Sequence, residues 1–421
     1  MAERAKLTVV IPTYNRSDLL GYTLKSLLRQ SLPVERFEVV VADDGSSDGT
    51  RDVVSEFAKS LRMRYVFLPR DEDEIAAKGY CVSRVRNRGA ALATAPVLVF
   101  MDTGVVAGHD FLAAHLAGHR VESSGPGEAV LGYTYGTHKL MPLRSLEELL
   151  RCQTPEQVVA AIGAGPRGLD LRHPQLRRSG FDITGYSGSW TLFWTLNASV
   201  STSDFLAVGG FDEAFRGWGF EDTELGYRLA RHGVRMSLSR EAWAIEWPLR
   251  PDVAGNDRSS IRNFQHFLTK HRDPEIEITV NVRSRYPLEQ FELRRAELEE
   301  WAARAAPIDV LPELEAVERD LRTLPARIAV VGCGGVVPRH WPASTLIDFD
   351  AELLARAAAG TGHTALRGLG LHTGLPDGAA DLVVVTSRLA GLWDRWGNEL
   401  MAEAHRVGAQ VRAPALVAAS R

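Results

Sequence analysis

The most constraining feature of this chain is the regular alternation of apolar and amphipathic segments in its first hundred residues. Continuous apolar, largely β-branched runs occupy residues 7–11, 37–42, 63–68 and 97–101. Runs of this length are typical of strands that are buried on both faces. Each is followed by a segment with helical spacing of its apolar residues, and such crossovers connect parallel strands. The sequence therefore predicts an α/β fold built on a doubly wound, mostly parallel sheet.

Size and charge narrow the classes of protein to consider. With 421 residues, 45% of them hydrophobic, the chain can bury a large core and is expected to form two or three domains. A net charge of −4 gives no basic surface for nucleic acid, so no nucleic-acid partner is expected. The three cysteines have neither metal-site nor disulfide-framework spacing.

The pattern divides the chain into three parts. Residues 1–284 are expected to form the first α/β domain, 285–325 a helical connector, and 326–421 a smaller Rossmann-like α/β domain. Within the first part, 146–162 is predicted to be helical, broken before Pro155. Residues 166–189, rich in Gly, Arg and Ser, are predicted to form a mobile loop.

No secretory signal and no transmembrane segment are visible. The first apolar run, residues 7–12, is much too short to span a bilayer, and no later run reaches about 18 apolar residues. The expected location is cytoplasmic, with peripheral association at a membrane left open.

Acidic residues stand where the predicted strands end. Asp43 follows the second run and Asp102 the fourth. Open α/β sheets bind their ligands outside the carboxyl ends of the strands, so both carboxylates are candidates for ligand contact. A third acidic site, Glu221-Asp222, opens a helix after a turn in which Trp218 lies between two glycines.

Together these segments resemble a known family. Residues 5–275 are similar to family-2 nucleotide-sugar glycosyltransferases with the GT-A fold. The resemblance is carried by Pro12-Thr13-Tyr14-Asn15, Asp43-Asp44-Gly45-Ser46, Arg86-Asn87-Arg88-Gly89, Asp102 and Gly217-Trp218-Gly219-Phe220-Glu221-Asp222. It implies an inverting transfer of a sugar from a nucleotide, with UDP the expected nucleotide, to an acceptor hydroxyl. The acceptor class, whether glycan, small molecule, lipid or peptide, stays open.

The resemblance also implies which side chains bind the donor. Asp43 would accept a hydrogen bond from a nucleobase, although an Asp at this position could instead cap the next helix. Tyr14 would line the base site or pack in the core. Arg86 would contact phosphate or base, or be a solvated helix charge. The predicted donor-binding residues are Pro12, Thr13, Tyr14, Asn15, Asp43, Arg86, Asn87 and Asp102.

The predicted catalytic residues are Asp222 and Glu221. Inverting transfer needs a carboxylate base to accept the proton of the attacking hydroxyl, and a helix N-terminus favours the ionised form. The resemblance assigns the base to Asp222, with Glu221 binding acceptor hydroxyls or supporting the loop. The alternative is ordinary helix capping. Asp43 and Asp222 are expected to face each other across one cleft.

Aromatic residues mark the expected acceptor side. Trp218 offers a flat apolar face for a sugar ring, and its flanking glycines permit close approach. Trp190, Trp194 and Asn197 are further acceptor candidates, with core packing as the alternative for the two tryptophans.

A metal site is expected at Asp102 and Glu246. Relatives usually carry Asp-x-Asp where this chain has Asp102-Thr103-Gly104, so Glu246 is predicted to supply the missing oxygen ligand. Mn²⁺ or Mg²⁺ is the expected cofactor, since hard cations accept carboxylates, phosphates and water as ligands. A metal-independent enzyme whose arginines hold the diphosphate is the alternative.

The last hundred residues resemble a truncated and degenerate class I methyltransferase. A Gly-rich turn at Gly332-Cys333-Gly334-Gly335 follows a predicted strand, and Asp348 ends the next one. The usual acidic residue before the first glycine is missing, so no S-adenosylmethionine is expected and a structural or acceptor-recruiting role is predicted. For the whole chain, the alternative function is a bifunctional or scaffolding protein with a degenerate, metal-independent transferase site.

Overall fold

The chain folds into two compact units, unit 1 (Met1–Phe264) and unit 2 (Gln265–Arg421). Each is described by itself below. The computed structural model describes residues 4–70, 81–119, 127–136, 143–162, 168–247, 253–279, 288–321 and 323–413.

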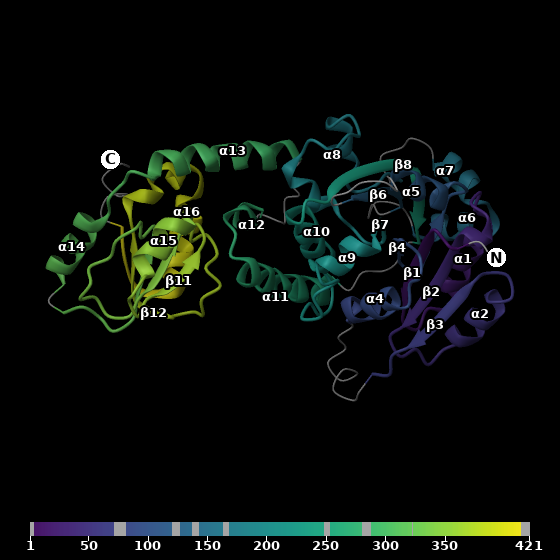
Figure 1. Cartoon of the computed structure of the whole chain (residues 1–421), viewed down its shortest axis with the longest axis horizontal. Helices are drawn as coiled ribbons and strands as arrows, with labels where there is room; N and C mark the ends of the chain where they lie inside the picture. The colour runs from purple at the N-terminus through teal and green to yellow at the C-terminus, as the bar shows by residue number, and fades with distance from the viewer. Residues whose placement is uncertain are drawn as a thin grey trace. The chain divides into compact units, whose positions relative to one another are not determined.

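Unit 1 is built on a sheet with eight strands among its described residues, in the order β3-β2-β1-β4-β7-β6-β8-β5 (Figure 1). The strands β3, β2, β1 and β4 are parallel, whereas β7 runs antiparallel to both β4 and β6. This mixed but mostly parallel sheet confirms the predicted fold class. The strands are β1 (Leu7–Thr13), β2 (Phe37–Asp43), β3 (Met63–Phe67), β4 (Val97–Met101), β5 (Val105–Ala107), β6 (Glu128–Tyr135), β7 (Asn197–Ser201) and β8 (Arg235–Glu246).

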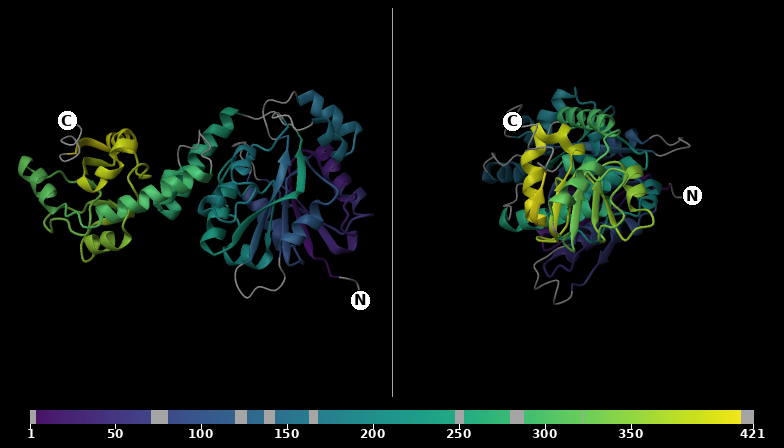
Figure 2. Two further views of the ribbon diagram at one scale, coloured as in Figure 1. Left: turned by 90° about the horizontal axis from the view of Figure 1, so that it is seen from above. Right: turned by 90° about the vertical axis from the view of Figure 1, so that its left-hand side faces the viewer.

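Helices cover both faces of the parallel half of this sheet (Figure 2). Val10 and Ala42 face α4, because a Cβ added to Gly89 of that helix would meet their side chains. Val9 and Ile11 point to the opposite face, as the period of two in a strand requires. The helices are α1 (Ser17–Leu27), α2 (Thr50–Phe57), α4 (Val82–Ala91), α5 (Phe111–Gly118), α6 (Leu143–Cys152), α7 (Pro155–Ile162), α8 (His173–Arg178), α9 (Thr202–Ala207), α10 (Glu221–Arg231) and α11 (Val253–His271).

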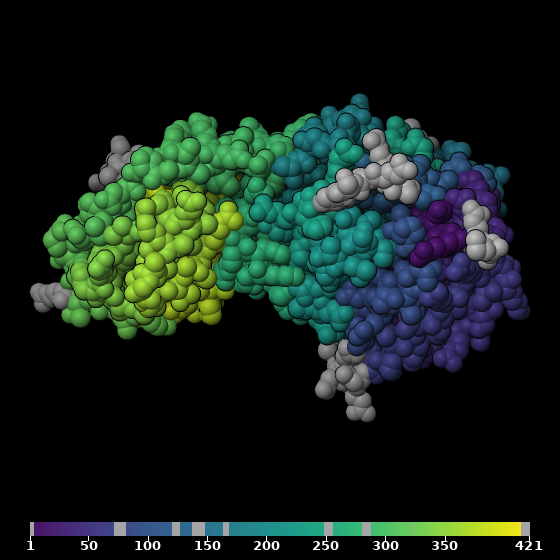
Figure 3. Space-filling model, in the orientation of Figure 1, coloured from purple at the N-terminus to yellow at the C-terminus, as the bar shows by residue number. Residues whose placement is uncertain are grey.

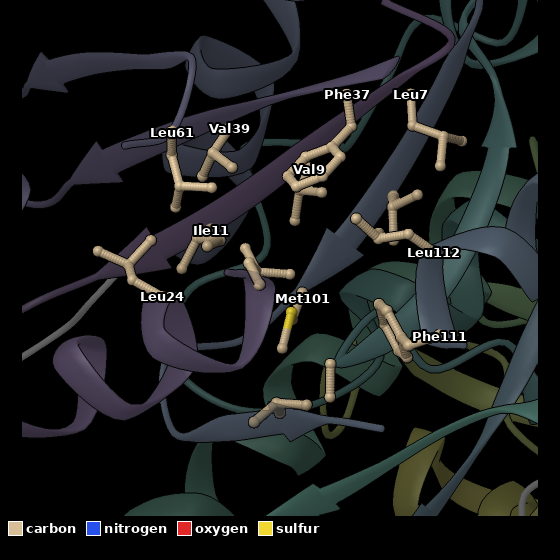
Figure 4. Close-up of a cluster of buried hydrophobic side chains, with 14 of the residues drawn as sticks. Leu7, Val9, Ile11, Leu24, Phe37, Val39, Leu61, Met101, Phe111 and Leu112 are labelled. Atoms are coloured by element: carbon tan, nitrogen blue, oxygen red, sulfur yellow. The ribbon is translucent and has the colours of Figure 1, made fainter. Parts of the chain in front are cut away.

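The core on the α1 face joins the strands to their covering helices (Figure 4). Val9, Ile11 and Val39 pack against Leu24 of α1, and Met101 lies in the same cluster. All five side chains are fully buried. The apolar runs in the sequence therefore form the centre of the sheet, which holds the strand ends rigidly in place.

One predicted segment differs from the structure. Residues 166–189 were expected to form a mobile loop, but their described part contains α8 and the buried side chains of Asp170, Arg172 and Ile183. Composition is misleading here because Gly and Arg content does not reveal that an arginine is buried with a carboxylate. The predicted helix over 146–162 is confirmed as two pieces, α6 and α7, that separate before Pro155.

Unit 2 is a smaller α/β unit, and its described residues form a packed body in the space-filling view (Figure 3). Its five strands are all parallel, in the order β11-β10-β9-β12-β13. This is the strand order of a Rossmann-like half and confirms the predicted second sheet. Its elements are α12 (Pro274–Ile278), α13 (Leu288–Ala305), α14 (Leu311–Asp320), β9 (Ile328–Val331), β10 (Thr345–Asp348), α15 (Ala351–Ala358), β11 (Thr364–Arg367), β12 (Ala380–Val385), α16 (Trp393–Val407) and β13 (Gly408–Arg412).

The division between the units falls within α11, upstream of the predicted boundary after residue 284, which lies outside the described residues. The predicted connector, 285–325, contains α13 and α14. Val310 and Leu314 at the start of α14 join the core of unit 2, so this part of the connector packs as part of that unit. In the parts of the chain that the structure describes, no helix is long and apolar enough to cross a bilayer.

Candidate active site

The carboxyl ends of three neighbouring parallel strands form the floor of the candidate site. Asp43 is the last residue of β2, Thr13 the last of β1, and Asp102 directly follows β4. Since β1 lies between the other two, a strand spacing of about 4.8 Å puts the ends of β2 and β4 about 10 Å apart. Thr103 donates a hydrogen bond to the Pro12 carbonyl at 2.8 Å and ties the strand ends together.

Arg86 joins this floor to the helix that carries the proposed base. Its Nη2 lies 2.7 Å from Asp102 Oδ1, and its Nη1 lies 3.4 Å from Glu221 Oε1. Arg86 is only 3% exposed, so the alternative of a solvated helix charge is wrong for it. Although burial opposes the charge, the carboxylates of Asp102 and Glu221 hold the pKa of Arg86 above its usual value. The guanidinium is a fixed positive centre between strand β4 and helix α10.

Negative charge exceeds positive charge around this arginine. Burial, followed by repulsion from Glu221, raises the pKa of Asp222 to about 7. Glu221 keeps its Oε2 buried without a hydrogen-bond partner among the described residues. Burial also raises the pKa of Glu246 to about 7, with a further contribution from the charge of Asp102. The site therefore has carboxylate oxygens to spare for a proton, a cation or a hydroxyl group.

The turn before α10 is built on backbone that favours glycine. Gly217 and Gly219 have φ values of 74° and 106°. The backbone N–H and carbonyl of Trp218, which lies between them, both bond the Ser259 hydroxyl of α11, at 3.1 and 3.0 Å. These bonds fix the turn, while the Trp218 side chain is 51% exposed and can receive a ligand. Phe220 ends the turn at φ 70°.

On the predicted donor side, Asp43 is 1% exposed and bonded within the protein. Its Oδ1 accepts the Ser46 N–H at 2.8 Å and its Oδ2 accepts the Tyr65 hydroxyl at 2.6 Å. Burial, together with this hydrogen bond, raises the pKa of Tyr65 to about 12. A carboxylate oxygen can accept more than one hydrogen bond, so the nucleobase contact of Asp43 stays a prediction.

Other predicted donor residues lie close to the same strand ends. Asn15 accepts the Ser47 N–H at 2.8 Å, which joins the loops after β1 and β2. The Tyr14 ring is 38% exposed and lies under the Arg70 guanidinium at 4.1 Å, so core packing is not its role. Thr13 Oγ1 is buried without a hydrogen-bond partner among the described atoms.

Asn87 supports the turn that precedes Trp218. Its Nδ2 donates to the Phe211 carbonyl at 2.9 Å and to Glu213 Oε1 at 3.0 Å, and its Oδ1 accepts the Phe211 N–H at 2.9 Å. Both donors of the amide are therefore used within the protein. The structure gives Asn87 a supporting role, and donor contact by this side chain stays a prediction.

The predicted acceptor residues separate into buried and exposed pairs. Trp190 is 2% exposed and packs edge-on against Tyr227 of α10, with ring centroids 5.3 Å apart. Asn197 is fully buried and bonds His115 Nε2 at 2.9 Å. The structure gives these two side chains packing and hydrogen-bonding roles within the protein. Trp194 is partly buried and Trp218 is exposed, so acceptor contact by these two rings stays a prediction.

Sequence reasoning missed a buried ion pair beneath the acceptor side. Asp170 and Arg172 are 1% and 2% exposed, and their closest charged atoms lie 2.7 Å apart. The guanidinium of Arg172 lies 4.9 Å from the ring centre of Trp194. The only sequence signal was the Asp-x-Arg spacing, which in a Gly- and Arg-rich segment has no distinctive meaning.

The metal expectation rests on two carboxylates that the sheet brings together. Val105 pairs with Glu246 across β5 and β8, which places Glu246 beside the segment that follows Asp102. In the described residues no group of three or more His, Cys, Asp or Glu side chains could hold a metal ion. Two carboxylates still fit a Mg²⁺-like ion, because such ions take one or two protein carboxylates and complete their shell with water and phosphate.

Gly104 explains why the second Asp of the usual motif is absent. Its φ is +94°, a conformation that L-residues rarely adopt. The Gly104 N–H bonds Thr23 Oγ1 at 2.9 Å, and its carbonyl accepts the Trp247 N–H at 2.8 Å. The local backbone conformation therefore favours glycine at this position.

In unit 2, the carboxyl end of strand β10 is occupied by bonds within the protein. Arg388 and Asp348 are both fully buried and form two N–H···O bonds of 3.1 Å. The Gly334 N–H from the Gly-rich turn also donates to Asp348, at 2.8 Å. Both carboxylate oxygens of Asp348 therefore accept hydrogen bonds from the protein itself.

Comparisons with known proteins agree with this geometry. Residues 8–119 match the family model described as glycosyl transferase family 2, and residues 177–245 match one described as the N-terminal domain of galactosyltransferase. Validoxylamine A glucosyltransferase of Streptomyces hygroscopicus subsp. jinggangensis is 42% identical over 97% of each chain. That of Streptomyces hygroscopicus subsp. limoneus is also 42% identical, over 97% of this chain and 90% of its own.

The chain belongs to glycosyltransferase family 2. It is therefore a glycosyltransferase, and the carboxylate-rich floor around Arg86 lies in the part of the chain that the family models match. Among solved structures, S. aureus TarS 1-349 in complex with UDP-GlcNAc is 16% identical, with 65% of this chain and 66% of that one covered and a TM-score of 0.45. The near-complete coverage of the Streptomyces relatives includes unit 2, so both units are shared with them.

Proposed function

We propose that this glycosyltransferase transfers glucose from UDP-glucose to a hydroxyl group of validoxylamine A, or of a closely similar acceptor, with inversion at the anomeric carbon. The 42% identity over nearly the whole length of two validoxylamine A glucosyltransferases supports the sugar and the acceptor. The observation that carries the chemistry is the convergence of Asp102, Glu221 and Asp222 around the single buried cation of Arg86.

In the proposed reaction Asp222 is the general base. It accepts the proton of the acceptor hydroxyl while that oxygen forms a bond to the anomeric carbon. The bond from this carbon to the UDP oxygen breaks, and UDP leaves with the electron pair. A pKa of about 7 is close to the value at which a base combines availability with driving force. A single displacement inverts the configuration.

Arg86 and the strand ends would organise the donor. The guanidinium bonds Asp102 on the donor side and Glu221 on the acceptor side. It therefore fixes the positions of these two carboxylates relative to each other. Asp43 and the exposed Tyr14 ring would bind the nucleobase at the neighbouring strand ends. Asp102 and Glu246 would hold a Mn²⁺ or Mg²⁺ ion, which when bound supplies positive charge to the departing diphosphate.

We assign unit 2 a structural or acceptor-recruiting role. The Asp348 carboxylate, which ends the second strand of a Rossmann-like half, is already bonded to Arg388 and to the Gly334 N–H. The bonds to Asp348 use both of its oxygens within the protein, which supports a role without S-adenosylmethionine.

The test is a direct assay with defined substrates. The protein is incubated with UDP-glucose, validoxylamine A and Mn²⁺, and products are examined by mass spectrometry for the gain of one hexose. The anomeric proton coupling of the product, measured by NMR, reports the configuration, and a β-linkage is expected from the α-linked donor. Parallel reactions with GDP-glucose and with EDTA test the nucleotide and the metal. Transfer only to other acceptors, or an α-linked product, would refute the acceptor or the inverting mechanism.

A further inference from the structure

The segment between β6 and β7 contains a buried arginine that the proposed mechanism does not use. Four N–H groups of Arg172 donate within the protein, including two to Asp170, at 3.0 Å to Oδ1 and 2.7 Å to Oδ2. The third goes to the Gly132 carbonyl of β6 at 2.6 Å, and the fourth to the Leu192 carbonyl at 3.0 Å. Four hydrogen bonds from a side chain that is only 2% exposed hold the guanidinium in one position.

These bonds connect two different parts of unit 1. Gly132 belongs to the sheet, and Asp170 is itself held to the sheet by the Thr134 N–H at 2.8 Å. Leu192 belongs to the segment that leads into β7, and the Trp194 ring of the same segment lies against the guanidinium. Arg172 therefore fixes the segment 192–194 to strand β6.

The same segment contacts the proposed base. The backbone N–H of Thr195 lies close enough to the Asp222 carboxylate to lower its pKa. Packing supports this contact, because a Cβ on Gly226 of α10 would lie 2.8 Å from the Trp190 carbonyl and 2.7 Å from the Phe193 Cβ. The segment is thus pressed against α10 on one side and bonded to Arg172 on the other.

We propose that the Asp170–Arg172 pair is a positioning device for glucosyl transfer, which sets the place of the Trp194 ring and of the Thr195 N–H and thereby orients Asp222 toward the acceptor. Neither side chain touches substrate or the reacting atoms. The inference rests on the proposed function, since it requires that Asp222 act on an acceptor hydroxyl. It assigns the pair to the acceptor half of the site, because the bonds of Asp170 and Arg172 go to β6 and to residue 192 and not to the donor-side strand ends.

The experiment measures donor binding and transfer separately in Arg172→Lys and Asp170→Asn. Lys keeps the charge but cannot reproduce the planar, two-bond geometry of Arg. We expect kcat for transfer to fall about 100-fold, as a misplacement on the order of 1 Å in a reacting group can cost. The Kd for UDP-glucose, measured by calorimetry without acceptor, should stay within about twofold, because the strand ends that bind the donor are unchanged.

Arg228→Lys is the matched control. Arg228 also forms an ion pair, with the buried Glu224 of α10 at 2.7 Å, and also bonds a carbonyl, that of Val208. Its bonds go to Glu224 and Val208 and not to the segment 192–195, so its loss tests the general effect of a weakened ion pair on the same helix. Transfer by this variant should stay within about threefold of wild type once corrected for folded protein.

Trp194→Leu provides a test that does not disturb the ion pair, because this ring is only partly buried. We expect about a tenfold loss in kcat/KM for the acceptor with unchanged donor affinity. Folded Arg172→Lys and Trp194→Leu proteins that transfer at the wild-type rate would overturn the proposal, as would a parallel loss of donor affinity. Wild-type protein that forms no glucosylated product would instead refute the proposed function, and the positioning role with it.

Discussion

Each unit places an aspartate and a buried arginine at the carboxyl end of a parallel strand, yet with different results. In unit 1, Asp102 follows β4 and pairs with Arg86 while keeping 38% of its side chain exposed. In unit 2, Asp348 ends β10 and pairs with Arg388, and neither is exposed at all. In unit 1, the carboxylates of Glu221 and Asp222 also act on Arg86. In unit 2, the further bonds to Asp348 come from the backbone N–H groups of Gly334 and Asp350.

The comparison shows that topology alone does not make a site. A parallel sheet brings strand ends together in both units, but chemistry needs oxygen atoms that the fold has not already satisfied. In unit 1, burial and then the charge of Glu221 raise the pKa of Asp222, whereas in unit 2 Asp348 and Arg388 pair one to one. We propose that this charge balance at the strand ends distinguishes a catalytic edge from a structural one.

The largest expected effect comes from Asp222→Asn. Removing the base should lower kcat for transfer about 10³-fold, because general base catalysis typically contributes 10²- to 10⁴-fold. The affinity for UDP-glucose should change little, since the donor-side strand ends are untouched. Initial rates and calorimetric donor binding, measured on the same preparation, check both statements.

Asp348→Asn in unit 2 is the matched control for this prediction. It makes the same chemical change at a strand end but should leave the rate of transfer per folded molecule unaltered. If both substitutions lowered the rate to a similar degree, the distinction between a catalytic and a structural edge would fail.

Next in size is the effect of Arg388→Met on the stability of unit 2. It leaves Asp348 buried without its cation, and breaking a buried pair costs about 3–5 kcal/mol of unfolding free energy. Urea denaturation followed by fluorescence measures the loss. The double variant Arg388→Met/Asp348→Leu should recover much of it, because no unpaired charge is then left in the core. A double variant as unstable as the single one would contradict this account.

How far the sequence predicts the fold differs between segments of unit 1. The strands with continuous apolar runs, such as β1 and β4, were predicted almost to the residue, because burial on both faces leaves an unambiguous pattern. The segment 168–189 was misjudged, because its order depends on Asp170 and Arg172 finding each other in the interior. No local pattern encodes such a tertiary pairing.

The candidate site divides in the same way. Asp102, Arg86 and Glu221 were predicted from motifs and come together in the structure. Trp190 and Asn197 were predicted from position alone, and both are buried. Position along the chain shows that a residue lies near the site. Whether its side chain faces the site or the core depends on tertiary packing, which the sequence does not show.

Acid should open the region of unit 1 around His115 and His119 before the sheet of unit 2. Burial lowers the pKa of His115 to about 3 and that of His119 to about 4, against 6.5 for an ordinary histidine. When this region opens, the two rings bind protons that they do not bind in the folded state, so below pH 6.5 they should lower its opening free energy, by about 4 kcal/mol at pH 4.5. The raised pKa values of Asp222 and Glu246 act in the opposite direction when the whole of unit 1 unfolds, so the effect is expected in local opening. Among the described histidines of unit 2 none is buried to the same degree.

Hydrogen exchange measured by mass spectrometry at pH 6.5 and 4.5 resolves the two units, with rates corrected for the intrinsic pH effect. Peptides from β6 and β7 should lose protection and those from β9 and β12 should not. His119→Gln, which removes one titrating ring beside Ser199, should reduce the pH dependence. Since Glu128 and Asp204 also act on His119, an unchanged pH dependence in this variant would assign the acid effect to those carboxylates.

The smallest expected effect comes from substitution of Gly104, the position at which the resembled family usually has a second Asp. Gly104→Ala should cost about 1 kcal/mol of unfolding free energy, because its φ of +94° disfavours any Cβ although the nearest atoms lie at 3.4 Å or more. Gly360→Ala in unit 2, at φ +67° with nothing within 4 Å, isolates the same backbone cost without neighbours. Equal losses in chemical denaturation would mean that backbone conformation fixes Gly104. Gly104→Asp should then lose stability to a similar degree and bind Mn²⁺ no more tightly than the wild type. Tighter Mn²⁺ binding by Gly104→Asp would contradict this account, because it would show that a carboxylate can act as a metal ligand at this strand end.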